Sequence, residues 1–133
     1  MPLLSLREHQ MRLNEIVEVV DQTEGLPDAE NILWVDDVRS PQSFEIGKFT
    51  IARNYNDAIK ALNTEQFDRV YLDHDLGDFS GPERREMTGY DVLMNMVQAK
   101  MDGKPVPKKV SLLTANPVAR QRMQGVIDKY FTR

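Results

Sequence analysis

Short runs rich in apolar residues recur along the chain, and each is followed by a polar residue. They cover residues 31–35, 48–53, 69–72 and 110–113. The first and third runs are almost continuously apolar, which is typical of strands buried on both faces of a parallel sheet, whereas a strand with one face in solvent alternates apolar and polar residues. The pattern therefore predicts four parallel strands.

Helical spacing of apolar residues fills the intervals between these runs. It predicts a short helix that begins at Asp57, a helix over residues 89–101, and a last helix that follows Asn116 as its N-cap. A further amphipathic helix is expected over residues 4–22, where leucine and valine recur at helical spacing.

Strands that alternate with helices predict an α/β fold, and 133 residues are enough for one domain with its own core. We place this domain at 1–133, with the N-terminal helix at 4–22 and the α/β core at 31–131. Only about eleven residues, 37–47, join the first strand to the second, so no full covering helix is expected there. The helix at 4–22 would cover the face left bare, because a parallel sheet needs both faces buried.

The composition excludes several classes of protein and of site. Hydrophobic residues make up 41% of the chain and charged residues 29%, as in soluble globular proteins, and no apolar run approaches the ~18 residues of a membrane span. Without cysteine there is no disulfide, thiolate nucleophile or cysteine-bound zinc, so hard cations such as Mg²⁺ with oxygen ligands are the expected metal chemistry. The first ten residues lack the pattern of a signal peptide. We therefore expect a cytoplasmic location and no contact with a membrane.

Charge is divided unevenly along the chain. The net charge is −4, but residues 104–133 carry seven basic residues against one acid, an excess of six positive charges, so residues 1–103 carry −10. A basic segment of this kind attracts anionic ligands, although a solvated helix face explains most such clusters. The segment is a candidate surface for a protein or nucleic-acid partner.

Polar residues follow three of the expected strands, at the edge where open parallel sheets bind ligands. If these strands are neighbours, two groups of aspartates meet with no lysine nearby in the sequence, and such carboxylates repel one another unless they share a cation. Each aspartate alone is also typical of a solvated turn. The residues are Asp36 and Asp37 after the first strand, Asp73, His74 and Asp75 after the third, and Thr114 and Asn116 after the fourth.

The same residues carry a resemblance to a known family. LWVDD at 33–37, YLDHD at 71–75 and LLTA at 112–115 resemble response-regulator receiver domains, in which an acidic pair, a phosphoacceptor aspartate and a Thr or Ser form a magnesium site. The resemblance implies a receiver-like (flavodoxin-like) three-layer sandwich with a truncated sheet, and Asp73 at the phosphoacceptor position. A receiver has a fifth strand that ends in lysine, and none is expected here, so ordinary phosphorelay signalling is not expected.

A narrower resemblance is closer. Four stretches within about residues 32–125, namely DDVRSP (36–41), LDHDLG (72–77), TGYDVL (88–93) and TANPVARQRM (114–123), are similar to the cyclic-phosphate processing receiver domain. The resemblance implies a cyclic phosphate as the substrate class. The chain departs from this family at Leu113, where the family has a histidine, and at Arg122, where it has an asparagine.

If the site is catalytic, the chemistry of its residues indicates their roles. Asp36, Asp37 and Asp73 would hold Mg²⁺, which neutralises phosphate charge and activates a water. His74 and Asp75 would move a proton, although a histidine hydrogen-bonded in a loop is an equally good interpretation. A wide separation of Asp36 and Asp37 from Asp73, or a basic side chain already lying among these acids, would rule out a shared cation.

Four residues are candidates for binding the phosphate of a small molecule or RNA end. Arg39 would bind it bidentately, and Thr114, Asn116 and Arg120 would act with the exposed amides of the last helix. Thr114 is also a catalytic candidate. The first functional hypothesis is Mg²⁺-dependent hydrolysis of a cyclic phosphate on a nucleotide or RNA end. The alternative is a non-catalytic receiver-like module that binds a protein or nucleic acid.

Overall fold

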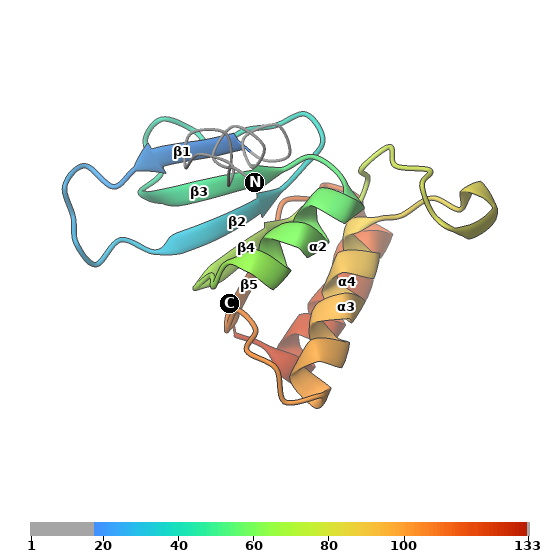
Figure 1. Ribbon diagram of the computed structural model, residues 1–133. Helices are drawn as coiled ribbons and strands as arrows, with labels where there is room; N and C mark the ends of the chain where they lie inside the picture. Colours follow the sequence, from blue (N-terminus) through green and yellow to red (C-terminus); the bar gives the residue numbers. More distant parts are fainter. Residues whose placement is uncertain (1–17, 133) are drawn as a thin grey trace, which may run out of the picture.

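The computed structural model describes residues 18–132, which form an α/β fold around one sheet (Figure 1). The receiver-like α/β class expected from the sequence is confirmed. In chain order the elements are β1 (Glu18–Gln22), β2 (Asn31–Val35), β3 (Gly47–Ala52), α2 (Tyr55–Thr64), β4 (Arg69–Leu72), a 3₁₀ turn (Pro82–Arg84), α3 (Gly89–Met101), β5 (Lys109–Leu112) and α4 (Pro117–Tyr130).

The sheet has five strands in the order β1-β3-β2-β4-β5. β2 lies at its centre and pairs in parallel with β3 and β4, so that Trp34 is opposite Ile51 on one side and Tyr71 on the other. β5 pairs in parallel with β4. The four expected parallel strands are thus confirmed. β1 is an additional strand, which pairs antiparallel with β3 at the edge.

The helix expected over residues 4–22 is wrong at its end. Residues 18–22 form β1, and residues 4–17 lie outside the described part of the chain. The apolar residues of β1, Val19 and Val20, are β-branched and favour extended backbone. Pairing with β1 also satisfies backbone N–H and C=O groups of β3 that would otherwise be unpaired at the edge of the sheet. This long-range pairing outweighs the local helical spacing.

The helices α2, α3 and α4 pack on one face of the sheet (Figure 1). Leu33 and Val35 of β2 point to this face and are buried in a cluster with residues of all three helices. Ile32 and Trp34 point to the other face, where they are buried with Phe49 of β3. The helix expected over residues 4–22 would form the third layer of the sandwich, on the face opposite α2, α3 and α4. Most of that segment lies outside the described residues, so this layer stays a prediction.

Most other expected local features agree with the structure, although α2 begins at Tyr55, two residues before the expected start at Asp57. α3 and α4 have the expected bounds, and the side chain of Asn116 caps α4. Residues 36–46, between β2 and β3, contain no helix. Among residues 18–132 there is no helix with the length and apolarity needed to cross a bilayer. The cytoplasmic location stays a prediction.

Candidate metal and phosphate site

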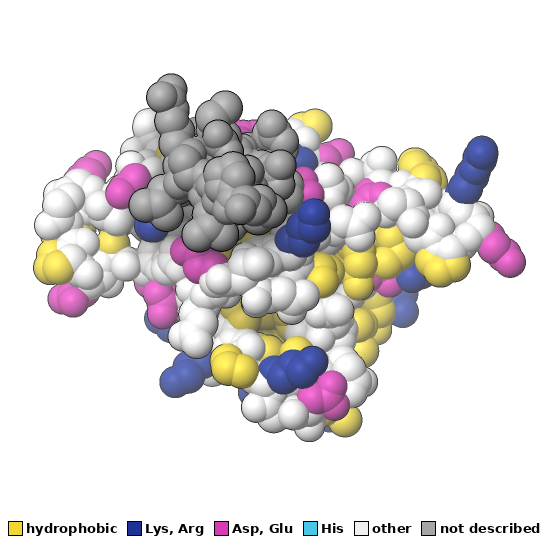
Figure 2. Space-filling view, in the orientation of Figure 1, with side chains coloured by type: hydrophobic (Ala, Val, Ile, Leu, Met, Phe, Trp, Pro, Cys, Tyr) yellow, Lys and Arg dark blue, Asp and Glu magenta, His cyan; other side chains and the backbone are white. Residues whose placement is uncertain are grey.

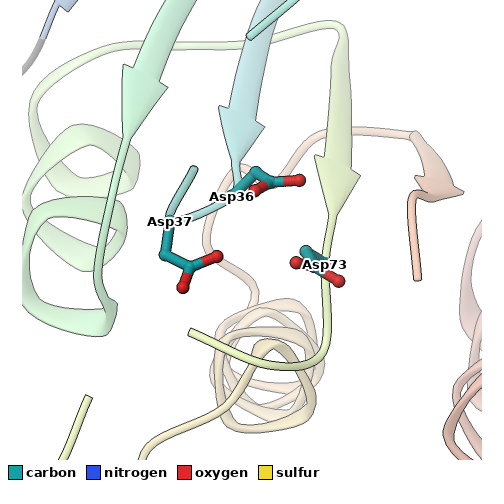
Figure 3. Close-up of side chains that lie close together, drawn as sticks. All are labelled: Asp36, Asp37 and Asp73. Carbon is teal, nitrogen blue, oxygen red and sulfur yellow. The ribbon is translucent and has the colours of Figure 1, made fainter. Parts of the chain in front are cut away.

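The acids that follow β2 and β4 lie together at the carboxyl end of the sheet (Figure 3). β2 and β4 are neighbouring parallel strands, and the backbone N–H of Asp73 donates to the carbonyl of Val35 at 2.9 Å. One carboxylate oxygen each of Asp36, Asp37 and Asp73 can be chosen so that all lie within 4.8 Å of one another. Asp36 and Asp73 are buried, and Asp37 is partly buried. The expected meeting of these acids is confirmed, whereas their binding of a metal stays a prediction.

Arg39, which was expected to bind phosphate, lies among these acids; the expectation that they lack a neutralising partner considered only lysine. Its Nε donates to Asp36 Oδ2 at 2.8 Å, and its Nη2 lies 3.6 Å from Asp73 Oδ1. The same Nη2 donates to the carbonyl of Leu113 at 2.9 Å. This arrangement meets the condition set above against a shared cation, so a metal here requires Arg39 to give up its contacts with Asp36 and Asp73. The guanidinium does not neutralise the site. Three carboxylates facing one guanidinium still leave two negative charges when all are ionised.

Ionising Asp73 remains unfavourable despite the nearby positive charge of Arg39. Burial raises the pKa of Asp73, and the carboxylates of Asp36 and Asp37 raise it further. Arg39 and the backbone N–H of His74 act in the opposite direction without outweighing them. A cation beside Asp73 would remove part of this cost, because opposite charge favours the ionised carboxylate.

Asp36 is held by a tight local turn. Its Oδ1 accepts hydrogen bonds from the backbone N–H groups of Val38 at 3.0 Å and of Arg39 at 2.9 Å. Arg53, at the end of β3, donates from Nη1 to the carbonyls of Asp36 and Arg39, at 3.2 and 2.6 Å. Its Nη2 donates to Ser40 Oγ at 2.8 Å. Arg53 was not among the expected site residues; its position after a strand adjacent to β2 was the signal that could have identified it.

The TGYDVL stretch positions the loop that carries Asp73. Thr88 and Asp91 form a capping box at the start of α3, in which Asp91 Oδ2 accepts from the Thr88 backbone N–H at 2.8 Å. Gly89 donates its N–H to the carbonyl of His74 at 2.9 Å. A Cβ at Gly89 would overlap the carbonyl oxygen of Asp73 and lie 2.8 Å from its carbonyl carbon. The glycine therefore allows the close approach of α3 to the acid site.

His74 and Asp75 lie in this loop and contact each other. His74 Nδ1 is 2.8 Å from Asp75 Oδ1, and the side chain of Asp75 is largely exposed. Among the described residues, His74 does not belong to the group of side chains able to share an ion with Asp36 and Asp73. The structure thus pairs two of the three catalytic candidates with one another and gives no support to His74 as a metal ligand.

The phosphate-binding candidates after β5 are engaged within the protein. Thr114 is buried, and its Oγ1 accepts from the N–H of Asn116 at 3.2 Å. Asn116 Oδ1 accepts from the N–H groups of Val118 and Ala119, at 3.1 and 3.2 Å. Arg120 Nη1 donates to the carbonyl of Thr114 at 3.1 Å. The expectation of exposed amides at this helix terminus is wrong, because the N-cap that the sequence predicts already satisfies them.

Several basic side chains of residues 104–132 are also engaged within the chain. Lys109 Nζ donates to Glu30 at 3.0 Å, Arg122 lies over the ring of Tyr90 at 3.9 Å, and Arg120 bonds Thr114 as above. On the face drawn in Figure 2, lysine and arginine side chains are separated by other surface and do not form one patch. A protein or nucleic-acid partner for this segment stays a prediction.

A comparison with known protein families covers most of the chain. Residues 31–129 match the family model for the cyclic-phosphate processing receiver domain, so the match includes both acid-bearing strands and α4. Neither the curated proteins nor the solved structures include a match to the chain.

Proposed function

Since the chain belongs to the family of cyclic-phosphate processing receiver domains, we propose that it hydrolyses a cyclic phosphate ester in a reaction that requires Mg²⁺. The substrate would be the cyclic phosphate of a nucleotide or of an RNA end. One observation carries the proposal: Asp36, Asp37 and Asp73 offer carboxylate oxygens within 4.8 Å of one another at the carboxyl end of the sheet.

The donor set suits a hard divalent cation. All three candidate ligands are carboxylates, which Mg²⁺ prefers, and the raised pKa of Asp73 reflects burial and negative neighbours that a cation would offset. These residues would hold the ion, which when bound would neutralise phosphate charge and activate a water.

Arg39 would exchange its contacts with the acids for contacts with the phosphate. Its guanidinium contacts Asp36 and the carbonyl of Leu113, yet 51% of its side chain is exposed, so a ligand can reach it from solvent. A phosphate beside the acids would offer two oxygens to the guanidinium fork. Arg120 and Asn116 have a different role in this proposal: they fix the backbone around Thr114.

Hydrolysis forms a bond from a water oxygen to phosphorus, releases one proton of that water to solvent, breaks one ring P–O bond, and places a proton on the leaving oxygen. We assign that proton to His74, which lies in the loop directly after Asp73. Asp75, 2.8 Å from His74 Nδ1, would orient the ring so that the other nitrogen faces the substrate.

Binding of Mg²⁺ is tested by the fluorescence of Trp34, the single tryptophan of the chain. The Trp34 indole donates to the carbonyl of Arg39 at 3.0 Å, so a change at the acid site reaches the fluorophore. We expect a saturable change with Mg²⁺ that Asp73→Asn abolishes. Asp28→Asn is the matched control, since Asp28 is exposed and precedes β2 at the opposite end of the sheet. Equal responses of the two variants would contradict the site.

Turnover is tested by incubation with nucleoside 2′,3′-cyclic monophosphates, with and without EDTA. We expect formation of the ring-opened monophosphate only where Mg²⁺ is present, and its loss in Asp73→Asn but not in Asp28→Asn. Hydrolysis that persists in EDTA would rule out the metal-dependent reaction.

A non-catalytic binding module is the second candidate. It is favoured by the contact of Arg39 with Asp36, by the capped amides of α4, and by Leu113 at the position of the family histidine. Saturable Mg²⁺ binding without turnover of any cyclic phosphate would support this candidate.

A further inference from the structure

A cavity of about 640 Å³ opens beside the acid site, between the turn from β3 to α2 and the loop after β4. Gly77 lies between the cavity and the acid site. It lines the cavity, and a Cβ built on it would lie 3.7 Å from Asp37 Oδ2. A ligand whose phosphate lies at the acids can therefore extend its remaining part into this cavity. The volume is within the range of small-molecule sites.

Hydrogen bonds hold the two walls of the cavity together. Asp78 accepts from the N–H of Tyr55 at 2.9 Å and from the N–H of Ser80 at 3.0 Å. Asn54 caps α2 by accepting from the N–H of Asp57 at 2.9 Å. The cavity is thus part of the folded structure and does not depend on closure of a loop.

The cavity presents an aromatic ring that the core does not use. Phe79 lines it and is 61% exposed, beside the buried side chain of Leu76. Asn56, also in the lining, is exposed and offers an amide. A flat aromatic surface with neighbouring polar groups suits a nucleobase, which stacks on aromatic side chains with little preference for sequence.

The charge of the cavity limits what it accepts. Asp57 and Asp78 outnumber the one cation of the lining, Arg53, which is also 3.5 Å from Glu18 Oε1, so the lining carries a net negative charge. Carboxylates accept hydrogen bonds from ribose hydroxyls and from the amino groups of bases, but they repel a second phosphate. The cavity therefore favours one nucleoside over a continuing polynucleotide.

We propose that this cavity binds the nucleoside part of a mononucleoside cyclic phosphate, with the base stacked on Phe79 and its donors facing Asp57. The proposal rests on the proposed function only for the position of the phosphate. It predicts that a free mononucleotide is a better substrate than an RNA end, because the latter carries a further phosphate on the same nucleoside.

Steady-state hydrolysis compares adenosine 2′,3′-cyclic monophosphate with glycerol 1,2-cyclic phosphate, which has no base. Phe79→Ala is expected to raise KM for the adenosine ester about 5- to 100-fold more than for the glycerol ester, and Phe79→Trp is expected to restore it. The matched control is Phe44→Ala, since Phe44 is 76% exposed and does not line the cavity. An equal effect of Phe79→Ala on both esters would overturn the proposal.

Two further measurements separate this proposal from the proposed function. Binding of adenosine alone is followed by saturation-transfer NMR and is expected to be lost in Phe79→Ala, whether or not any ester is hydrolysed. A dinucleotide ending in a 2′,3′-cyclic phosphate is expected to bind at least about fivefold more weakly than the mononucleotide, and Asp57→Asn is expected to reduce this difference. Tighter binding of the dinucleotide would assign the cavity to an RNA end instead.

Discussion

Arg39 occupies space that a divalent cation would share beside Asp36 and Asp73. Its Nε is 2.8 Å from Asp36 Oδ2, and Asp36 is fully buried. Removing the guanidinium leaves the Asp36 charge with backbone donors only, which lowers stability, but it also removes a positive charge that repels the ion. We expect Arg39→Ala to melt several degrees lower in EDTA and to bind Mg²⁺ roughly fivefold more tightly, equivalent to about 1 kcal/mol.

Thermal unfolding at increasing Mg²⁺ concentration measures both effects, because a ligand that binds only the folded state raises Tm. Arg39→Lys is the control: it keeps the charge and is expected to bind Mg²⁺ as weakly as the original protein. Weaker Mg²⁺ binding by Arg39→Ala would mean that Arg39 organises the carboxylates and does not compete with the ion.

Asp73 is expected to illustrate a conflict between function and stability. Burial, Asp36 and Asp37 together raise its pKa, so the folded state holds the Asp73 proton more tightly than the unfolded state does. Such a group lowers stability progressively as pH rises through the titration range, and an uncharged residue avoids this loss. We expect Asp73→Asn to increase the free energy of unfolding by about 1 kcal/mol at pH 7 in EDTA.

Urea denaturation at pH 7 and at pH 4 measures this change, which is expected to be smaller at pH 4, where more of Asp73 is protonated. The exposed-acid variant Asp28→Asn is expected to differ from the original protein by less than about 0.5 kcal/mol at both pH values. Destabilisation by Asp73→Asn in EDTA would show that the carboxylate is satisfied without a cation.

At the level of residues, the meeting of the three acids could be predicted from the sequence, whereas the hydrogen bonds around them could not. Asp36, Asp37 and Asp73 could be placed together because each follows a strand, and parallel strands end at one edge. The hydrogen bond from Arg39 to Leu113 could not be predicted, because Leu113 is 74 residues away and its carbonyl is positioned only by the pairing of β5. The N-cap at Asn116 was predicted, but the competition between capping and phosphate binding for the same amides was not recognised.

At the level of elements, the start of α3 is the point where a helix constrains the site. Gly89 and Gly125 both lie in helices, but a Cβ at Gly89 would overlap the backbone of Asp73, and one at Gly125 meets nothing within 4 Å. We expect Gly89→Ala to destabilise the protein by about 2–3 kcal/mol, since backbone must move, and Gly125→Ala to stabilise it by roughly 0.5–1 kcal/mol.

Urea denaturation of the two variants provides the comparison, with Gly125→Ala as the control for helix propensity. Mg²⁺ binding is expected to weaken in Gly89→Ala alone, because the displaced segment carries Asp73. A neutral effect of Gly89→Ala on both stability and Mg²⁺ binding would show that α3 does not fix the site.

Elements with a local cause were predicted and elements with a distant cause were not. α3 begins at a capping box and α4 at an Asn N-cap, both visible in neighbouring residues. β1 forms because the edge of β3 needs a partner, and its register places Val20 opposite Phe49. No periodicity within residues 4–22 reports on that edge, which explains why the predicted helix extended into a strand.

Across the whole molecule, the two ends of the sheet serve different purposes. The carboxyl end gathers Asp36, Asp37 and Asp73, where charges of one sign face each other. At the amino end, Glu30 accepts from Arg69 Nε and from Lys109 Nζ, both at 3.0 Å, so one carboxylate joins β4 and β5. Opposite charges are paired at the amino end of the sheet, and like charges meet at the carboxyl end, where we propose that the ion and the phosphate bind.

This division predicts that Glu30→Gln lowers stability without affecting Mg²⁺ binding. Burial alone would raise the pKa of Glu30, but hydrogen bonds and charge from Lys109 and Arg69 outweigh it, so the pKa is lowered. A lowered carboxyl pKa contributes stability above the ordinary value of 4.5, and this contribution is lost as pH falls through the folded-state pKa. We expect a loss of about 1 kcal/mol at pH 7, since the pair is only partly buried.

The loss is measured by urea denaturation between pH 7 and pH 3. The difference between the two proteins is expected to shrink as pH falls below 4.5 and to vanish only below the lowered pKa of Glu30 in the folded state, where Glu30 itself is protonated. Raising the salt concentration at pH 7 is expected to reduce the difference, because ions screen partly exposed pairs. The Trp34 response to Mg²⁺ is expected to be the same in both proteins. A weakened response in Glu30→Gln would show that the two ends of the sheet are coupled, because Glu30 precedes β2 and Asp36 follows it.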